Sequence, residues 1–428
     1  MKKYVSIALG LCLAASLVAS KPCSAGFAVG GENGWQLTTD GIVDVFATYN
    51  TTSPHPGAGS HTLGLLDNTG SEYNQRFGIG VGLLPSVVAF NIKAPTTNGI
   101  DSTVRIGIYP SIQNGDNANL GLANSDRFSV GSNIDFREMF YTAKGKYGEL
   151  LAGKALNLYQ AKNILTDMTL LTAGTVGLRA HTVTLGHIGY GYLYTGFGPQ
   201  MRYTTPDFGG AKLAIAIAEP YSISDYSDKT NTPRVEAELS FAKTFGPGVS
   251  TQAWLAGLYQ CATRSKAAAL RPGENVESIG GAYGIGVGFK GLNLLGSGYG
   301  GRGLGTVSAQ DGPAKIAGLF AGSTDDDGKG RLGWGFLLQA TYKITPSIMI
   351  GTNYGQTRLE ETDLDSSIRT STAPYALIKN QESAVFSVTY NLNAFTQFVG
   401  EYIYAQNTWH DGAKQHSNQF ALGTMFYW

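Results

Sequence analysis

The chain has 428 residues, of which 58 are glycine and only 14% are charged, and its mean hydropathy is −0.07. After residue 25 it has no uninterrupted apolar run of about eighteen residues, which excludes an ordinary membrane-spanning helix from that part of the sequence. Abundant glycine and aromatic residues in short alternating segments are typical of an all-β barrel. No linker-like stretch divides the chain, so we expect one domain.

Residues 1–25 have the features of a secretory signal peptide. Lys2 and Lys3 precede an apolar core over residues 5–19, and Cys23-Ser24-Ala25 is a small-residue cleavage site. Cleavage after Ser20 is also compatible with the sequence. We therefore expect residues 26–428 to be exported and to form the barrel.

The exported part is mildly acidic and has one cysteine. Removing residues 1–25 leaves 28 basic and 31 acidic residues, a net charge of −3. This balance argues against a nucleic-acid partner. Cys261 remains alone, which excludes an intrachain disulfide and argues against a zinc site, and we expect neither a metal nor a cofactor.

Sixteen segments alternate with the side-chain period of two that defines a β-strand. They cover residues 35–50, 73–93, 101–110, 134–143, 148–156, 198–204, 211–219, 234–244, 250–259, 278–289, 292–299, 333–343, 347–357, 383–390, 395–405 and 417–428. Pro85 predicts an interruption of the second segment. The connections alternate between turns of about three to eight residues and loops of more than about ten, the pattern of a membrane barrel with short periplasmic turns and long extracellular loops.

The last segment carries a further signal. Phe420, Leu422, Phe426 and Trp428 lie on one face of the strand, and the other face is mostly small or polar. In a closed membrane barrel the apolar face meets lipid and the exposed edge disappears. The segment resembles the C-terminal signal that the barrel-assembly machinery reads in Gram-negative outer-membrane proteins, with Trp428 where phenylalanine is usual.

The whole layout from about residue 35 to residue 428 resembles the sixteen-stranded trimeric porins of Gram-negative bacteria. The stretches that carry this resemblance are residues 149–154, the hairpin over residues 200–213, and residues 390–402. It implies an all-β transmembrane antiparallel barrel of about sixteen strands, a homotrimer surrounded by outer-membrane lipid. It also implies a multi-pass protein of the cell outer membrane that is exported through the periplasm.

In these porins the third long loop folds into the barrel, and the resemblance assigns that role to residues 157–197. Apolar residues in the loop, among them Ile164, Leu165 and Met168, favour packing against the barrel. A loop that covers the surface as a lid is the alternative.

The resemblance also implies a pore constriction lined by charged residues. The candidates are Lys154, Arg105, Arg137, Lys162, Asp167, Arg179 and Arg202, with Lys93 as a further basic residue of the wall. Lys154 occupies the position of the family's pore arginine. Charges at a constriction select ions of opposite sign, and because the basic candidates outnumber Asp167 we expect a mild anion preference.

Two alternatives stay open for these residues. Each charge could simply be hydrated in a wet lumen, and periodicity does not decide whether Arg137 or Glu138 points inward. Acidic residues on the remaining wall are also expected to face the lumen. They are Asp44, Glu236, Glu238 and Glu401.

The sequence thus predicts a porin that forms a passive, water-filled channel for small hydrophilic solutes. The alternatives are a channel that prefers small carboxylates, and a surface adhesin or receptor built from the loops of the same barrel. We expect no enzyme, because the six histidines all lie in predicted loops without a nucleophile motif beside them.

Overall fold

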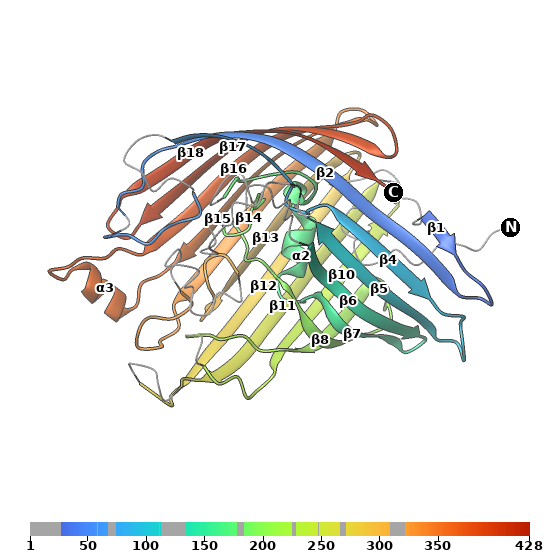
Figure 1. Cartoon of the computed structure of the whole chain (residues 1–428), viewed down its shortest axis with the longest axis horizontal. Helices are drawn as coiled ribbons and strands as arrows, with labels where there is room; N and C mark the ends of the chain where they lie inside the picture. Colours follow the sequence, from blue (N-terminus) through green and yellow to red (C-terminus); the bar gives the residue numbers. More distant parts are fainter. Residues whose placement is uncertain are drawn as a thin grey trace.

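The computed structural model describes residues 27–57, 59–66, 74–110, 112, 134–177, 184–224, 228–246, 248–265, 271–308 and 322–428. In these residues antiparallel strands form a closed barrel, and the first described residues lie on the same side of it as the C-terminus (Figure 1). The predicted signal peptide, residues 1–25, lies outside the described residues.

The wall consists of consecutive strands, each hydrogen-bonded to its neighbours in the chain, apart from one strand that is interrupted. They are β2 (Gln36–Thr52), β3 (Asn74–Gly80), β4 (Val87–Lys93), β5 (Asp101–Pro110), β6 (Ile134–Gly145), β7 (Gly148–Leu156), β8 (Phe197–Thr204), β9 (Ala211–Ala218), β10 (Arg234–Phe245), β11 (Val249–Thr263), β12 (Asn275–Phe289), β13 (Leu292–Arg302), β14 (Leu332–Lys343), β15 (Ile348–Leu359), β16 (Ile378–Asn391), β17 (Thr396–Trp409) and β18 (Lys414–Tyr427). Strand β18 pairs with β2 and closes the ring.

The strands β3 and β4 together form one interrupted wall strand. Both pair with β2, β3 along residues 46–52 and β4 along residues 36–42. Counted in this way, the described residues form a barrel of sixteen strands, as the sequence predicts. The interruption at residues 81–86 contains Pro85, which has no backbone N–H for the ladder.

Most strand boundaries agree with the prediction, and those of β5 and β7 are identical to it. The last connection differs. Residues 405–408 pair with residues 414–417, so the connection spans only residues 410–413 and the expected long loop is absent there. The sequence did not predict the short strand β1 (Phe27–Gly30), which pairs with β2 just beyond the end of β18.

The two faces of the wall have opposite character. On β12, Ile279, Tyr283 and Ile285 are exposed on the outside, whereas Ala282 is buried on the inside. Phe420, Leu422 and Phe426 of β18 also lie on the outer face, where 50 to 70% of each side chain is exposed. Apolar side chains that point outward, away from a largely small or polar interior, are the arrangement of a transmembrane barrel.

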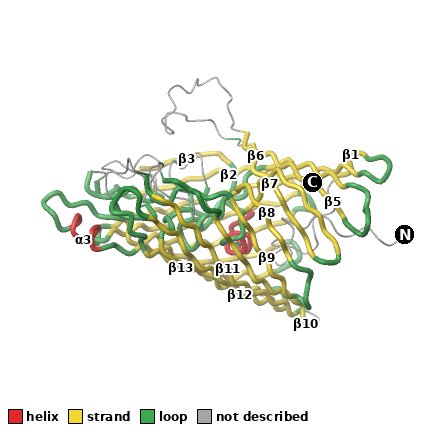
Figure 2. Tube along the Cα trace, turned by 90° about the horizontal axis from the view of Figure 1, so that it is seen from below, coloured by secondary structure: helices red, strands yellow, loops and turns green. Residues whose placement is uncertain are grey.

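In the described part of the chain, the loops contain three short helices. They are α2 (Ala161–Thr166), the 3₁₀-helix η2 (Met168–Leu171) and α3 (Asp363–Arg369). In both views α2 lies within the ring of strands, whereas α3 lies at one end of the barrel (Figures 1 and 2). Among the described residues no helix is long and apolar enough to cross a membrane.

Candidate functional site: the interior of the barrel

The connection between β7 and β8 runs through the barrel. We call its described residues, 157–177 and 184–196, the inner segment. Its apolar side chains pack on the inner wall: Tyr159 and Leu193 lie against Ala256 and Ala282, and Met168 belongs to a cluster around Phe46. Alanines on the wall leave the space that these large side chains occupy.

A wall carboxylate holds the start of the inner segment. Glu236 of β10 accepts hydrogen bonds from the backbone N–H groups of Leu158 (2.7 Å) and Tyr159 (3.1 Å). Its other oxygen lies 2.9 Å from Arg234, and both side chains are 2% exposed. The carboxylate therefore satisfies two backbone donors that burial would otherwise leave without partners.

Side-chain amides hold the middle of the segment. Asn163 of α2 accepts a hydrogen bond from Trp254 Nε1 at 3.0 Å and donates to the carbonyl of Gly298. Gln339 of β14 accepts from the N–H of Met168 at 2.6 Å and donates to the carbonyl of Thr166. Helix α2 is thereby fixed to the wall at Asn163 and at its C-terminal residue, Thr166.

A second carboxylate holds the following turn. Glu401 of β17 accepts hydrogen bonds from the N–H groups of Ala173 and Gly174, both at 3.0 Å. Gln419 of β18 then binds both backbone groups of Val176, accepting from its N–H at 2.8 Å and donating to its carbonyl at 3.0 Å. The inner segment is thus attached to the wall from β10 to β18.

The interruption between β3 and β4 provides another attachment. The N–H groups of Leu83 and Leu84 donate to the carbonyls of Thr172 (2.9 Å) and Leu170 (3.1 Å). Asp44 fixes the interruption itself, because its carboxylate accepts from Ser86 Oγ at 2.8 Å and from the N–H of Gly82. The break that Pro85 causes therefore frees backbone groups to bind the inner segment.

We expected Asp167 to face the lumen, but its side chain is buried within the inner segment. Its oxygens accept hydrogen bonds from Tyr192 (2.7 Å), Asn353 (3.2 Å) and the N–H of Thr169 (2.9 Å). The carboxylate caps η2, where buried N–H groups need an acceptor.

His187 lies beside this carboxylate as a neutral ring. Its Nε2 is 3.4 Å from the carbonyl of Ser383, and its Nδ1 is 3.3 Å from the amide nitrogen of Asn353. Burial lowers the pKa of His187 below its usual value of 6.5, although Asp167 acts in the opposite direction. Burial likewise raises the pKa of Tyr192. The network thus surrounds the Asp167 carboxylate with hydrogen-bond donors from Tyr192, Asn353 and Thr169.

Lys154 lies on the outer face of the wall, which corrects the sequence interpretation. It pairs with Met139 on β6 and Pro199 on β8, and Met139 is 58% exposed on the outside. The reason is that side chains alternate along a strand. Leu151 and Ala155 of β7 are buried on the inner face, and Lys154, which directly precedes Ala155, therefore lies on the outer face.

Arg105 points inward, but its charge is compensated. Its guanidinium donates to Glu138 (2.8 Å), Asp40 (3.0 Å) and Asn91 (2.9 Å), and Tyr109 also donates to Glu138 at 2.9 Å. Two carboxylates around one guanidinium leave no free positive charge, so Arg105 holds the wall strands together rather than presenting a cation to solutes.

A β-bulge decides the question at residues 137 and 138. Gly107 pairs with Glu138 and Ile108 pairs with Phe136, so Arg137 is the extra residue between them. Because Phe136 and Met139 both point outward, Arg137 and Glu138 are both on the inner side. Arg137 forms an ion pair with Asp135 at 2.7 Å and lies over the ring of Tyr109.

Lys162 and Arg202 remain as the predicted cations inside the barrel that no carboxylate contacts directly among the described residues. Lys162 is half-buried on α2, and Arg202 of β8 donates to the carbonyl of Leu156 at 3.4 Å. The charges of both act on Glu238 of β10, a buried inward carboxylate. Arg179 lies outside the described residues.

The wall acids differ from expectation in their role. Asp44, Glu236 and Glu401 accept backbone N–H groups of the chain inside the barrel, so they do not present free carboxylates to water. Sequence reasoning also missed the amides Gln339 and Gln419. The available signal was their position on the inward face of otherwise regular strands. In the described part of the chain no group of three metal-binding side chains occurs.

Comparison with known proteins finds similar folds among solved structures but no similar sequence family. No protein-family model and no curated protein sequence matches the chain. Among solved structures, the outer-membrane channel DcaP of Acinetobacter baumannii has a TM-score of 0.63 at 14% identity, covering 94% of this chain and 100% of that one. An anion-selective porin from Comamonas acidovorans has a TM-score of 0.60 at 12% identity, covering 92% and 100%.

Salmonella typhi OmpF in complex with daunomycin is also similar, with a TM-score of 0.53 at 12% identity over 94% of this chain and 100% of that one. Sequence identities this low establish the fold and nothing finer. The chain therefore has the closed sixteen-stranded barrel fold found in these outer-membrane channels and porins.

Proposed function

We propose that the protein is a porin, a passive water-filled channel for small hydrophilic solutes across the outer membrane. The observation that carries this proposal is the closed barrel with an apolar outer face and a polypeptide segment bound along its inner wall. In such a wall the backbone groups of neighbouring strands pair with each other around the closed ring, which is the condition for lying in lipid. The lumen is then the only route for a polar solute.

The inner segment narrows this route, and the charges beside it set the ion preference. Lys162 and Arg202 are free of direct ion pairs with described carboxylates, whereas Arg105 is neutralised and Lys154 faces outward. Charges in a narrow passage act at close range, whereas those on exposed loops are screened within about 8–10 Å. We therefore propose a mild preference for anionic solutes such as small carboxylates, with Arg179 as a further contributor from the sequence.

Location and assembly complete the proposal. The chain is exported by means of residues 1–25, which are then removed, is inserted by the barrel-assembly machinery through its C-terminal strand, and forms a homotrimer in the outer membrane of a Gram-negative bacterium. The outward aromatic residues of β18 support the insertion step. The native mass of the detergent-extracted protein tests the trimer, and a stable monomer would contradict it.

A liposome-swelling assay tests the channel itself. Proteoliposomes are shifted into isotonic solutions of sugars of increasing size, and the swelling rate is followed by light scattering. We expect rapid swelling with the smallest sugars and a decline with size. Swelling no faster than that of protein-free liposomes, for all sugars, would reject the channel.

A further inference from the structure

A charged pocket lies at the long-loop end of the barrel, where three connections between strands meet. We propose that it binds a small zwitterion, a molecule such as an amino acid or a short peptide that carries both a carboxylate and an ammonium. The carboxylate binds Arg264 and the ammonium binds Asp325. This adds a ligand site in the loops to the proposed channel and does not depend on conductance.

The pocket has a volume of about 390 Å³. Arg264 lines it from the connection between β11 and β12, Asp325 from the connection between β13 and β14, and Asp363 from the start of α3. Most of the other lining residues are charged or polar as well. A small hydrophilic molecule therefore fits this pocket in both size and polarity.

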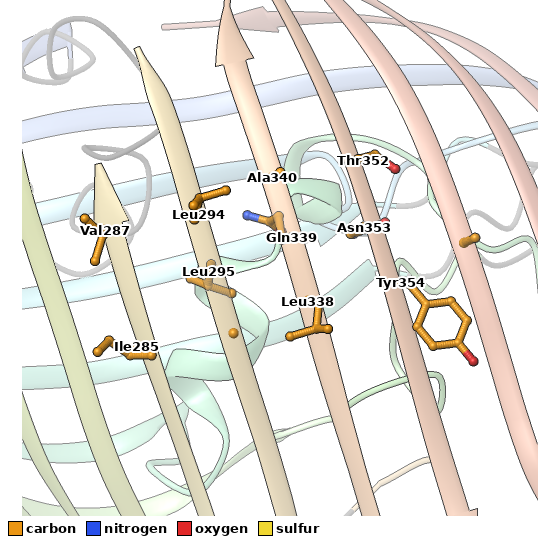
Figure 3. Close-up of a pocket in the computed structure, with 12 residues that line it drawn as sticks. Ile285, Val287, Leu294, Leu295, Leu338, Gln339, Ala340, Thr352, Asn353 and Tyr354 are labelled. Atoms are coloured by element: carbon orange, nitrogen blue, oxygen red, sulfur yellow. The ribbon is translucent and has the colours of Figure 1, made fainter. Parts of the chain in front are cut away.

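A larger hollow on the outer face of the wall has the opposite character. It covers β12 to β16, has a volume of about 590 Å³ and is lined mainly by apolar side chains such as Ile285, Leu294 and Leu338 (Figure 3). In a lipid-facing wall, hydrocarbon chains fill such a hollow without any specific contact. The lining of the loop pocket, in contrast, favours a ligand with charged groups.

Arg264 is a buried cation whose charge the protein does not balance. Its side chain is 6% exposed, and Nη2 donates to the backbone carbonyl of Asp326 at 3.1 Å. Among the described residues, Nε and Nη1 have no hydrogen-bond partner, and no carboxylate forms an ion pair with the guanidinium. An unpaired buried charge is costly, and a carboxylate is the group that a guanidinium binds most strongly.

The turn from Asp325 to Gly328 lies over this guanidinium. A Cβ atom at Gly328 would be 2.9 Å from Arg264 Nη1, and the backbone φ of Gly328 is +82°. Glycine therefore lets the turn approach the guanidinium closely. A ligand carboxylate reaches Nε and Nη1 when this short turn shifts outward.

Asp325 is the matching buried anion. Its side chain is 5% exposed, and Oδ1 accepts a hydrogen bond from the backbone N–H of Lys329 at 2.8 Å. In the described part of the chain no cation forms an ion pair with it, so Arg264 and Asp325 line the same pocket without pairing with each other. A carboxylate offers about four acceptor sites, which leaves capacity for the N–H donors of an ammonium.

The spacing of these two charges suits a small molecule. Arg264 is hydrogen-bonded to the backbone of Asp326, the residue directly after Asp325. A simple anion on Arg264 would be repelled by Asp325, and a simple cation on Asp325 would be repelled by Arg264. A molecule that carries both charges satisfies the two residues at once.

The remaining charges of the pocket compensate one another. Arg271 lies 3.6 Å from both Glu274 and Asp327, and Lys329 lies 3.3 Å from Asp363. These side chains are largely exposed, so their contacts with a ligand compete with water. The buried pair of Arg264 and Asp325 therefore determines which ligand binds.

Isothermal titration calorimetry of the detergent-solubilised full chain tests the site. The probes are alanylalanine, N-acetyl-alanylalanine, which lacks the ammonium, and alanylalanine amide, which lacks the carboxylate. We expect alanylalanine to bind about tenfold more tightly than either capped form. Equal binding of all three, or no binding of alanylalanine, would overturn the proposal. A capped form that binds as tightly as alanylalanine would assign a simple anion or cation site and would also overturn it.

Two variants separate the parts of the site. Arg264→Gln should remove the advantage of alanylalanine over its amide but keep the advantage over the N-acetyl form. Asp325→Asn, whose amide oxygen can still accept from Lys329 N–H, should do the reverse. A general loss of folding cannot produce these opposite patterns, and wild-type discrimination in either variant would overturn the site.

Lys146→Gln is the control for loss of a single charge. Lys146 lies in the turn between β6 and β7, at the opposite end of the barrel from the pocket, and the variant should bind all three peptides as the wild type does. Equal effects of Lys146→Gln and Arg264→Gln would contradict a local site. Failure of the channel proposal is distinguishable, because a barrel without conductance would still discriminate among the peptides.

Discussion

Replacing Glu401 by alanine should free part of the inner segment and change the channel current. The carboxylate accepts two backbone N–H groups, those of Ala173 and Gly174, at 3.0 Å each. Hydrogen bonds to charged groups contribute about 1.5–3 kcal/mol each, so the loss is roughly 3–6 kcal/mol locally. The attachments through Glu236 and Gln339 remain, and Gln419 still holds Val176, so α2 should stay bound while the turn at residues 173–174 loosens.

Single-channel recording in planar bilayers measures the effect. We expect the Glu401→Ala channel to fluctuate between conductance levels that the wild type does not visit, with a higher mean. Glu401→Gln, whose amide oxygen still accepts one N–H group, should have a smaller effect. Glu277→Ala is the matched control, since that carboxylate lies on the outer face of β12 and, among the described residues, accepts a hydrogen bond from Tyr259 alone. If Glu401→Ala gives the same levels and noise as Glu277→Ala, the carboxylate does not hold the segment.

Other predictions concern selectivity, pH and stability. Lys154→Glu should leave the reversal potential in a KCl gradient unchanged, whereas Lys162→Glu should shift it toward cations; the opposite pattern would return Lys154 to the lumen. Because burial lowers the pKa of His187, its neutral form stabilises the inner segment above about pH 6.5, and this contribution should be lost as pH falls below that value. Current fluctuations should therefore increase on acidification, and a His187→Asn channel with the same pH response would refute the assignment. Arg105→Ala leaves two carboxylates unpaired and should lower the free energy of unfolding by about 3 kcal/mol in urea titrations, and an unchanged midpoint would contradict its bridging role.

The wall was predictable from the sequence because its period of two is set by lipid outside and a packed or polar interior. Residues such as Phe420 and Leu422 alternate for this reason in the second half of β18. The sequence did not predict the tip of the hairpin between β17 and β18, where the strands extend to Trp409 and begin again at Lys414. Its upper part carries polar residues on both faces, so hydrophobic alternation fades before the pairing does.

The interior was less predictable, because contacts between distant strands determine it. The compensation of Arg105 requires Asp40 and Glu138 to meet across β2, β4, β5 and β6, and no local pattern gives that register. A bulge at Arg137 likewise has no clear local signal. Lys154 is a different case: it shares a face with Leu150, so periodicity alone places it outside, and only the family resemblance placed it in the pore.

Planar-bilayer conductance of the purified wild type tests the central claim most directly. The account predicts stepwise insertion of channels with a current proportional to voltage at low potentials and a conductance that rises with salt concentration. Far-UV circular dichroism of the same sample should be dominated by β-structure. A folded, membrane-inserted barrel that gives no conductance steps in repeated trials would contradict the claim that this protein is a channel.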